Sequence, residues 1–323
     1  MPEATAAPLP DIAGRLIERI AIRAPSLIVT VWGDTIAAHG EAVWLGSLIR
    51  LMGDFGLNER VVRTSVFRLQ KDNWLAREQI GRRSLYDLTS SARRISAAGD
   101  SRIYRPSPPE WRGEWLVLIL GPSTAEVREK LRRELLLQGF GSPSPGVFVR
   151  PDGDFASARD LLEEAGAAED VVAFHSDGAL TEGLGPVRRL VAHAWDHAAL
   201  EQGYREFIQL FRPVLAEAAG LDDRARFVVR TLLIHEFRRV TLRDPMLPAE
   251  LLPADWPGQR ARDLCAAIYR AIHAGAARHA MAVLETRAGR LPKPRAAYYD
   301  RFGGIDWENG GRQQAAARGG TDR

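Results

Sequence analysis

The pattern that most constrains this chain is a helix followed at once by a short hairpin, between Asn58 and Thr89. Asn58 is a favourable N-cap and Glu59 suits the positive end of a helix dipole, so the helix has a defined start. A rotation of about 100° per residue places one set of side chains on an apolar face: Val62, Ser65, Val66 and Leu69. The same rotation turns the others away from it: Arg60, Arg63, Thr64, Phe67, Arg68 and Lys71. We therefore expect an apolar inner face and an exposed basic outer face.

The flanking segments predict the rest of a winged helix-turn-helix. Apolar residues at helical spacing indicate a preceding helix that ends at Gly56: Leu45, Leu48, Ile49, Met52 and Phe55. Pro25 and Ser26 begin a further helix upstream, with Ile28, Val31 and Trp32 directed to the same core. Residues 76–89 predict two strands that turn at Gly81, with Tyr86 and Leu88 facing inward. Arg82 and Arg83 would lie at the tip of this wing.

The distribution of charge favours duplex DNA as the partner of this module. The chain has a formal net charge of +3, and residues 1–104 contain 14 Lys and Arg against 11 Asp and Glu, so the remainder is neutral. Residues 58–94 alone contain 9 basic and 4 acidic side chains. Excess positive charge at this place would neutralise phosphates and make binding sensitive to salt. The residues predicted to contact DNA are Arg60, Arg63, Thr64, Arg68, Lys71, Arg82 and Arg83.

Composition points to a globular cytoplasmic protein. The 323 residues are 46% hydrophobic, which is enough for sizeable cores in two or three domains. The single cysteine, Cys265, excludes an internal disulfide and lies in an apolar run that favours a buried hydrophobe over a reactive thiol. No apolar stretch approaches the roughly 18 residues that a membrane helix needs, and the N-terminus does not have the pattern of a signal peptide. We expect residues 1–24 and 301–323 to be poorly ordered.

The overall expectation is a multidomain α+β protein. The winged helix and a linking helix that ends near Tyr104 occupy 25–104, and prolines at 106, 108 and 109 mark a boundary. Residues 110–183 predict a ferredoxin-like α/β domain. Its strands are expected at 115–120, in GVFVR and in VVAFHSD, with a further short strand hidden in GFGSPSPG. One helix begins with a Ser123/Glu126 capping box and runs to about Leu137, and another is expected at 156–165. Residues 187–300 predict a helical C-terminal domain with helices at 190–215, 222–242 and 259–287.

Tests for catalytic motifs give no case for an enzyme, a metal or a cofactor. His235-Glu236 begins a possible zinc-protease motif, but Arg239 stands where the second histidine must be. His193 and His197 would share a helical face, although no third ligand accompanies them. A nuclease-like enzyme on the central domain would depend on Asp152, Asp154 and Asp177, two of which lie in a turn-forming PDGD. That enzyme, and an adaptor that uses the winged helix to bind protein, are the alternatives to a DNA-binding regulator.

Three segments together resemble the PaaX family of bacterial transcriptional repressors. They are VRTSVFRLQKDNWL in the winged helix, WRGEWLVLIL in the central domain, and HEFRRVTLRDPMLPAELLPADWPG from His235 to Gly258. The resemblance spans about residues 23–287 in the same order. It implies a homodimer that represses phenylacetic acid catabolism genes from a palindromic operator and is released by an aryl-CoA thioester such as phenylacetyl-CoA.

Two further predictions concern particular side chains. A thioester effector needs cations for its phosphates, and the helix at 222–242 has a polar side, so the predicted ligand-binding residues are His235, Arg238, Arg239 and Arg243. The alternative is an ordinary helix with internal ion pairs, because Glu236 lies three residues from Arg239. Phe67, on the basic face, would either touch a thymine methyl group or pack on the wing, and we favour packing.

Overall fold

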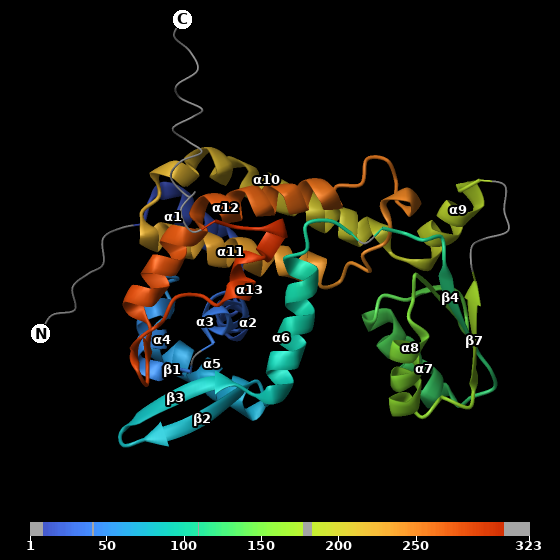
Figure 1. The fold of residues 1–323 in the computed structure, drawn as a ribbon, viewed down its shortest axis with the longest axis horizontal. Coiled ribbons are helices and arrows are strands. Elements are labelled where there is room, and N and C mark those ends of the chain that lie inside the picture. The colour runs from blue at the N-terminus through green and yellow to red at the C-terminus, as the bar shows by residue number, and fades with distance from the viewer. Residues whose placement is uncertain (1–8, 41, 109, 177–182, 307–323) are drawn as a thin grey trace, which may run out of the picture. The chain divides into compact units, whose positions relative to one another are not determined.

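The computed structural model describes residues 9–40, 42–108, 110–176 and 183–306, which form two compact units (Figure 1). Unit 1 contains the described residues of 1–106, 207–239 and 260–323, and unit 2 contains those of 107–206 and 240–259. Each unit therefore draws on segments that are distant in the sequence.

Unit 1 contains the helices and hairpin expected from the sequence over 25–104, preceded by a helix, α1, that was not expected. The element order is α1 (Asp11–Arg19), α2 (Ala24–Val31), a π-helical turn (Trp32–Ile36), α3 (Ala37–His39), β1 (Val43–Trp44), α4 (Leu45–Gly53), α5 (Glu59–Lys71), β2 (Leu75–Ile80), β3 (Arg83–Leu88) and α6 (Ser90–Ile103). The Asn58 side chain accepts a hydrogen bond from the backbone N–H of Val61, which confirms the predicted N-cap of α5. Gly81 has a φ of 59° in the turn between β2 and β3.

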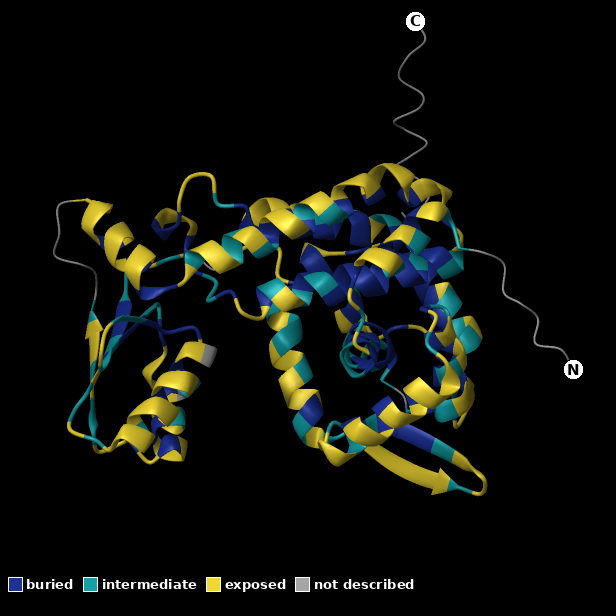
Figure 2. Cartoon of the chain, turned by 180° about the vertical axis from the view of Figure 1, so that it is seen from behind, coloured by how far each residue is buried: buried dark blue, intermediate teal, exposed yellow. Residues whose placement is uncertain are grey.

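The hairpin belongs to a three-stranded antiparallel sheet. Its strand order is β1-β3-β2, with Val43 opposite Tyr86 and Leu75 opposite Leu88. Tyr86 and Leu88 are buried, as predicted, whereas β2 is almost wholly exposed (Figure 2). The sheet therefore packs through β3 and leaves β2 as an open edge.

Later segments complete unit 1. The later part of α10 (His197–Glu217), most of α11 (Asp223–Thr241) and most of α12 (Gly258–Val283) belong to it, together with a short hairpin, β8 (Glu285–Thr286) and β9 (Gly289–Arg290), and α13 (Ala296–Tyr299). Asp54, at the end of α4, accepts a hydrogen bond of 2.6 Å from Arg224 of α11. Phe55 packs edge-on against Phe227 of the same helix. The N-terminal helices and the later helices thus share one core.

Unit 2 is built on a four-stranded antiparallel sheet. Its elements are β4 (Trp115–Leu120), α7 (Ala125–Leu137), β5 (Gly141–Ser144), β6 (Val147–Pro151), α8 (Phe155–Ala165), β7 (Val171–Ser176) and α9 (Gly185–Ala194). The strand order is β5-β6-β4-β7, and the short strand expected in GFGSPSPG is β5, whose register is irregular. Leu116, Leu118 and Phe148 pack against α7 and α8, while Trp115 and Val149 pack against Val187 and Val191 of α9. Both faces of the sheet therefore carry a core.

The terminal segments differ from the sequence prediction. Residues 11–19 form α1, which buries Ile12, Ala13 and Leu16, so the expected leading disorder does not extend to this helix. Arg301 and Phe302 are buried, so the expected disordered tail does not begin at 301. In both segments a few large side chains are anchored within a composition typical of disorder. The first eight residues and residues 307–323 lie outside the described part of the chain.

Three helix boundaries also differ. Thr124, not Ser123, caps α7 by accepting a hydrogen bond from Val127 N–H, so the predicted capping box is shifted by one residue. The helix expected at 190–215 is broken, because α9 ends at Ala194 and α10 begins at His197. The helix expected to reach 287 ends at Val283, and the β8–β9 hairpin follows it.

Candidate nucleic-acid interface and effector residues

The two faces of α5 are those predicted from its periodicity. Val62, Ser65, Val66 and Leu69 are buried. The outward residues are all exposed: Arg60, Arg63, Thr64, Phe67, Arg68 and Lys71. The helix thus presents a predominantly basic surface to solvent.

The arginines on this face form only weak, exposed ion pairs. Arg63 donates a hydrogen bond of 2.7 Å to Glu59, and Arg68 lies 3.7 Å from Asp72, but all four side chains are more than half exposed. Exposed ion pairs of this kind are worth about 0.2–1 kcal/mol, so a phosphate or a base can displace them. Within the described residues, neither Arg60 nor Lys71 lies within 4.0 Å of an acidic group. The face is available to an anionic partner.

Phe67 departs from the prediction that it packs on the hairpin. Its side chain is 67% exposed on the outer face of α5. Since a ring that packed against β2 or β3 would lose most of its exposure, the packing interpretation is wrong. The large apolar side chain faces solvent in the middle of the basic surface.

The two arginines of the hairpin have different surroundings. Arg82, in the turn, is exposed. The Arg83 guanidinium lies 4.1 Å from the centroid of the Trp44 ring and donates a hydrogen bond of 2.8 Å to Glu285. Glu285 also accepts a hydrogen bond of 2.5 Å from Arg50, and these two arginines lower the pKa of its carboxyl. Arg83 therefore pairs with Ile80 next to the turn, but its guanidinium is held against Trp44 and Glu285 and does not extend freely from the tip.

The β8–β9 hairpin contacts the three-stranded sheet at further points. The Trp44 indole N–H donates a hydrogen bond of 2.8 Å to the carbonyl oxygen of Thr286. Arg287 forms an ion pair with Glu78 of β2. Sequence reasoning missed this support, because Glu285 and Arg287 follow β3 by about 200 residues and no local pattern links them to it.

Two of the predicted ligand residues converge on one hydroxyl group. The Thr30 hydroxyl of α2 lies 2.9 Å from His235 Nδ1 and accepts a hydrogen bond of 3.0 Å from Arg238. Burial, with smaller contributions from Arg238 and Arg239, lowers the pKa of His235 to about 4, so this imidazole is neutral at neutral pH. The pair therefore offers one cation beside an uncharged ring.

Arg238 is a cation without an acidic partner in the part of the chain that the structure describes. It is only partly exposed, and burial lowers the pKa of its guanidinium. Arg239, by contrast, is exposed and donates hydrogen bonds of 3.0 and 2.9 Å to Glu236, as the ion-pair alternative expected. Arg243 is also exposed and belongs to unit 2, whereas the other three belong to unit 1.

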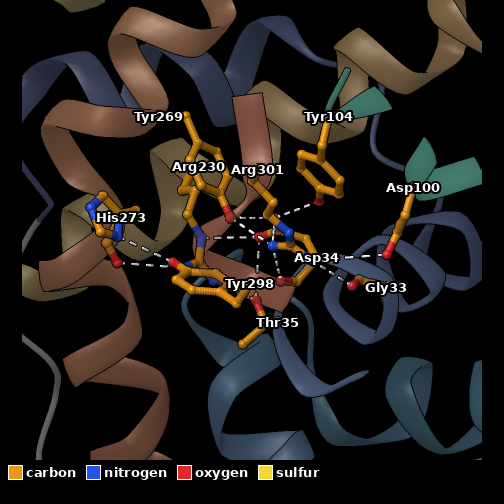
Figure 3. Close-up of polar contacts among 10 residues, drawn as sticks. All are labelled: Gly33, Asp34, Thr35, Asp100, Tyr104, Arg230, Tyr269, His273, Tyr298 and Arg301. Carbon is orange, nitrogen blue, oxygen red and sulfur yellow. Dashed lines mark hydrogen bonds and ion pairs between the residues drawn. The ribbon is translucent and has the colours of Figure 1, made fainter. Parts of the chain in front are cut away.

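A buried ionic cluster in unit 1 escaped the sequence analysis. Arg230 of α11 lies 2.9 Å from Asp34 in the π-helical turn, and Arg301 lies 3.1 Å from the same carboxylate (Figure 3). Tyr104 and Tyr269 donate hydrogen bonds of 2.7 and 3.0 Å to it. Burial opposes the charge on Arg230, but Asp34 and the neighbouring tyrosines raise the pKa of its guanidinium above the usual value. The cluster fixes five segments that are distant in the sequence to one another.

The residues of the rejected catalytic motifs do not assemble a metal site in the described residues. His193 lies on α9 and His197 on α10, so the predicted shared helical face does not exist. Asp152 accepts hydrogen bonds from Arg112 N–H, Asp154 accepts one from Ala156 N–H, and Asp177 lies outside the described residues. The described chain contains no group of three or more His, Cys, Asp or Glu that could hold a metal ion. Cys265 is buried, as predicted, and burial raises the pKa of its thiol.

Comparison with known proteins assigns the chain to a family. Profiles of the PaaX-like protein, the PaaX protein central Cas2-like domain and the PaaX-like protein C-terminal domain match residues 23–92, 108–191 and 195–282. The chain belongs to the PaaX family. It is 38% identical to the transcriptional repressor PaaX of Escherichia coli (strain K12), over 90% of this chain and 94% of that protein. The similarity is to a regulator and not to an enzyme, and it supports a repressor role.

A solved structure is similar to most of this chain. The uncharacterized protein Rv0674 from Mycobacterium tuberculosis has 27% sequence identity and a TM-score of 0.50, and the match covers 76% of this chain and 95% of that one. Among the described residues, no helix has the length and apolar character that crossing a membrane requires.

Proposed function

We propose that this protein is a DNA-binding transcriptional repressor whose residues 25–104 form a winged helix-turn-helix. The observation that carries the proposal is the exposed basic face of α5, followed directly by the β2–β3 hairpin. The name of the Escherichia coli relative supports it. The central α/β domain at 110–183, ferredoxin-like in our reading of its element order, and the helical domain at 187–300 complete the proposed division of the chain.

The proposal assigns different tasks to the basic residues. Arg60, Arg63, Thr64, Arg68 and Lys71 would face the major groove and its phosphates, since a helix of this kind enters that groove. Arg82 would contact a phosphate from the turn of the wing. Arg83, held by Trp44 and Glu285, would fix the angle of the wing and contribute positive charge beside the DNA.

A homodimer on a palindromic operator is part of the proposal. Ile119, Val172 and Phe174 are 42%, 56% and 52% exposed, and they lie on one face of the unit 2 sheet, because Ile119 pairs with Val172 and Val117 with Phe174. Such an exposed apolar sheet surface suits a second copy of the same surface. Sedimentation of wild type and Phe174→Glu tests this: we expect a dimer for the first and a monomer for the second. A wild-type monomer at micromolar concentration, free and on DNA, would contradict it.

The proposed effector is an aryl-CoA thioester such as phenylacetyl-CoA, acting on genes for aromatic catabolism. Arg238 supports an anionic ligand, because a largely buried cation that has no acidic partner among the described residues gains from an incoming phosphate. We propose His235, Arg238, Arg239 and Arg243 as ligand-binding residues, with Arg238 the most important. The ligand would favour a dimer whose two winged helices, residues 25–104 of each copy, no longer match the operator spacing.

Selection of duplexes from a random-sequence library tests the proposed function. The wild-type protein should enrich a palindromic sequence, and its affinity for that duplex should fall steeply as salt is raised, because bound phosphates release counterions. The adaptor alternative predicts no enrichment and no salt-dependent DNA binding. The nuclease alternative predicts that a labelled duplex is cut when Mg²⁺ is added and is protected by a chelator.

A further inference from the structure

Phe67 lies at the centre of the basic face of α5. Arg63 and Thr64 precede it by four and three residues and Lys71 follows it by four, so all three share its side of the helix. Its 67% exposure is the highest among the large exposed apolar side chains of the described chain. The other such residue on α5, Val61, is six residues away, which places it on a different side of the helix.

A partner that covers the Phe67 ring must tolerate the positive charge around it and offer a small apolar target. A protein surface that covered this ring would normally present an apolar patch, and α5 offers only one apolar residue within a ring of cations. The major groove of DNA is different, because it places an isolated apolar group, the thymine 5-methyl, among phosphates and polar base edges. The charge around Phe67 therefore complements DNA better than it complements protein.

We propose that Phe67 is a specificity-determining residue that contacts the 5-methyl group of a thymine in each half-site of the operator. The inference rests on the proposed DNA-binding function and deepens it. Arg63, Arg68 and Lys71 anchor the helix through phosphates and base edges, and the Phe67 ring excludes water from the methyl group. A cytosine at that position presents no methyl group, so the contact favours a T·A pair.

Replacing thymine with deoxyuridine isolates this contact. The substitution removes only the methyl group and leaves base pairing and hydrogen-bonding groups unchanged. Each thymine of the tightest duplex selected by wild-type protein is replaced in turn, symmetrically in both half-sites, and affinity is measured by fluorescence anisotropy. We expect wild type to lose about fourfold in affinity per half-site at one position. This loss corresponds to about 0.8 kcal/mol, the free energy of burying one methyl-sized group.

Phe67→Ala provides the second arm of the experiment. This variant should bind the thymine and deoxyuridine duplexes equally and more weakly than wild type binds the thymine duplex. Phe67→Leu should restore part of the discrimination, since it keeps an apolar side chain. Phe155→Ala is the matched control, because Phe155 is a 47% exposed phenylalanine of unit 2, and it should behave as wild type.

Three outcomes would overturn the proposal. In the first, wild type discriminates at no position. In the second, Phe67→Ala discriminates as strongly as wild type, which would assign the methyl contact to another residue. In the third, Phe67→Ala binds every duplex with unchanged affinity, which would show that the ring does not contact DNA and would point to a protein partner. In all three cases wild type still selects a duplex and binds it in a salt-dependent manner, whereas failure of the proposed function removes that selection itself.

Discussion

The Arg301 guanidinium lies 3.1 Å from the Asp34 carboxylate, so two buried residues separated by 267 positions are joined within unit 1 (Figure 3). Asp34 belongs to the π-helical turn that follows α2, and Arg301 follows α13 near the end of the described chain. Arg230 and two tyrosine hydroxyls approach the same carboxylate. The C-terminal segment is thus attached to the N-terminal helices of the proposed winged helix.

Loss of this carboxylate should destabilise unit 1 strongly. Asp34→Asn leaves two buried arginines without their shared counter-charge, and breaking a buried ion pair typically costs about 3–5 kcal/mol. Chemical denaturation should show a lower free energy of unfolding for this variant and for Arg301→Met. Arg159→Ala, which changes an exposed arginine of α8, is the control. If Asp34→Asn unfolds at the same denaturant concentration as wild type, the cluster does not hold the segments together.

Stability should fall as the pH is lowered from about 6.5 to about 4. Burial is the main cause that lowers the pKa of His39, His235 and His273 to about 4, against about 6.5 in the unfolded chain. Because the folded state resists protonation, these groups contribute stability above about pH 6.5, and that contribution is lost as pH falls through the folded pKa. Each contributes roughly 3 kcal/mol at most. Denaturation at several pH values measures how steeply the free energy of unfolding falls as the pH is lowered. This slope should be shallower for His235→Asn than for wild type, with exposed His193→Asn as control. Equal slopes for the two variants would refute the assignment.

Glu285 should support DNA binding without touching DNA. Glu285→Gln weakens the contacts to Arg83 and Arg50, so the wing should lose its fixed angle and operator affinity should fall several-fold. Arg82→Ala should act differently: it should weaken binding to all duplexes evenly and reduce the slope of log affinity against log salt by about one. Anisotropy titrations at several salt concentrations separate the two effects. A Glu285→Gln variant with wild-type affinity would show that the β8–β9 hairpin is not needed at the wing.

An aryl-CoA thioester, and not the free aryl acid, should release the protein from its operator. The acid has one carboxylate, whereas the thioester adds phosphates that can pair with arginines and supply the few kcal/mol of differential binding that a switch needs. Phenylacetate and phenylacetyl-CoA are titrated separately into the protein–DNA complex. Arg238→Ala should blunt release but keep DNA binding, and Arg159→Ala should respond as wild type does. Release by the acid at equal concentration would contradict the effector class, and a normal response of Arg238→Ala would move the site elsewhere.

Local patterns predicted the parts of the fold whose partners are close in sequence. The burial of Val62 and Val66 and the exposure of Arg63 follow from helical periodicity alone, and the cap at Asn58 follows from side-chain chemistry. The break between α9 and α10 was missed because apolar residues continue through it. Asp196, which accepts a hydrogen bond from Ala199 N–H, was the available signal for a new helix start.

The surroundings of the charged side chains could not be predicted in the same way. The position of Arg83 beside the predicted turn suggests a free cation at the wing tip. Only the fold brings Trp44 and Glu285 to it. Asp34 and Arg301 likewise carry no local sign of burial, because each is stabilised by partners far along the chain. Side-chain type therefore predicted where charge gathers, whereas tertiary contacts decide which charges remain free for a ligand.

Operator binding by Arg63→Ala and Arg68→Ala tests the central claim most directly. Affinities for the selected duplex and for a scrambled duplex are measured by anisotropy at fixed salt, with Arg159→Ala as control. We predict that each of the two α5 variants loses about 1–3 kcal/mol on the selected duplex and much less on the scrambled one, because base-edge contacts give specificity. If both variants bind the two duplexes as wild type does, α5 is not the reading helix and the account is wrong.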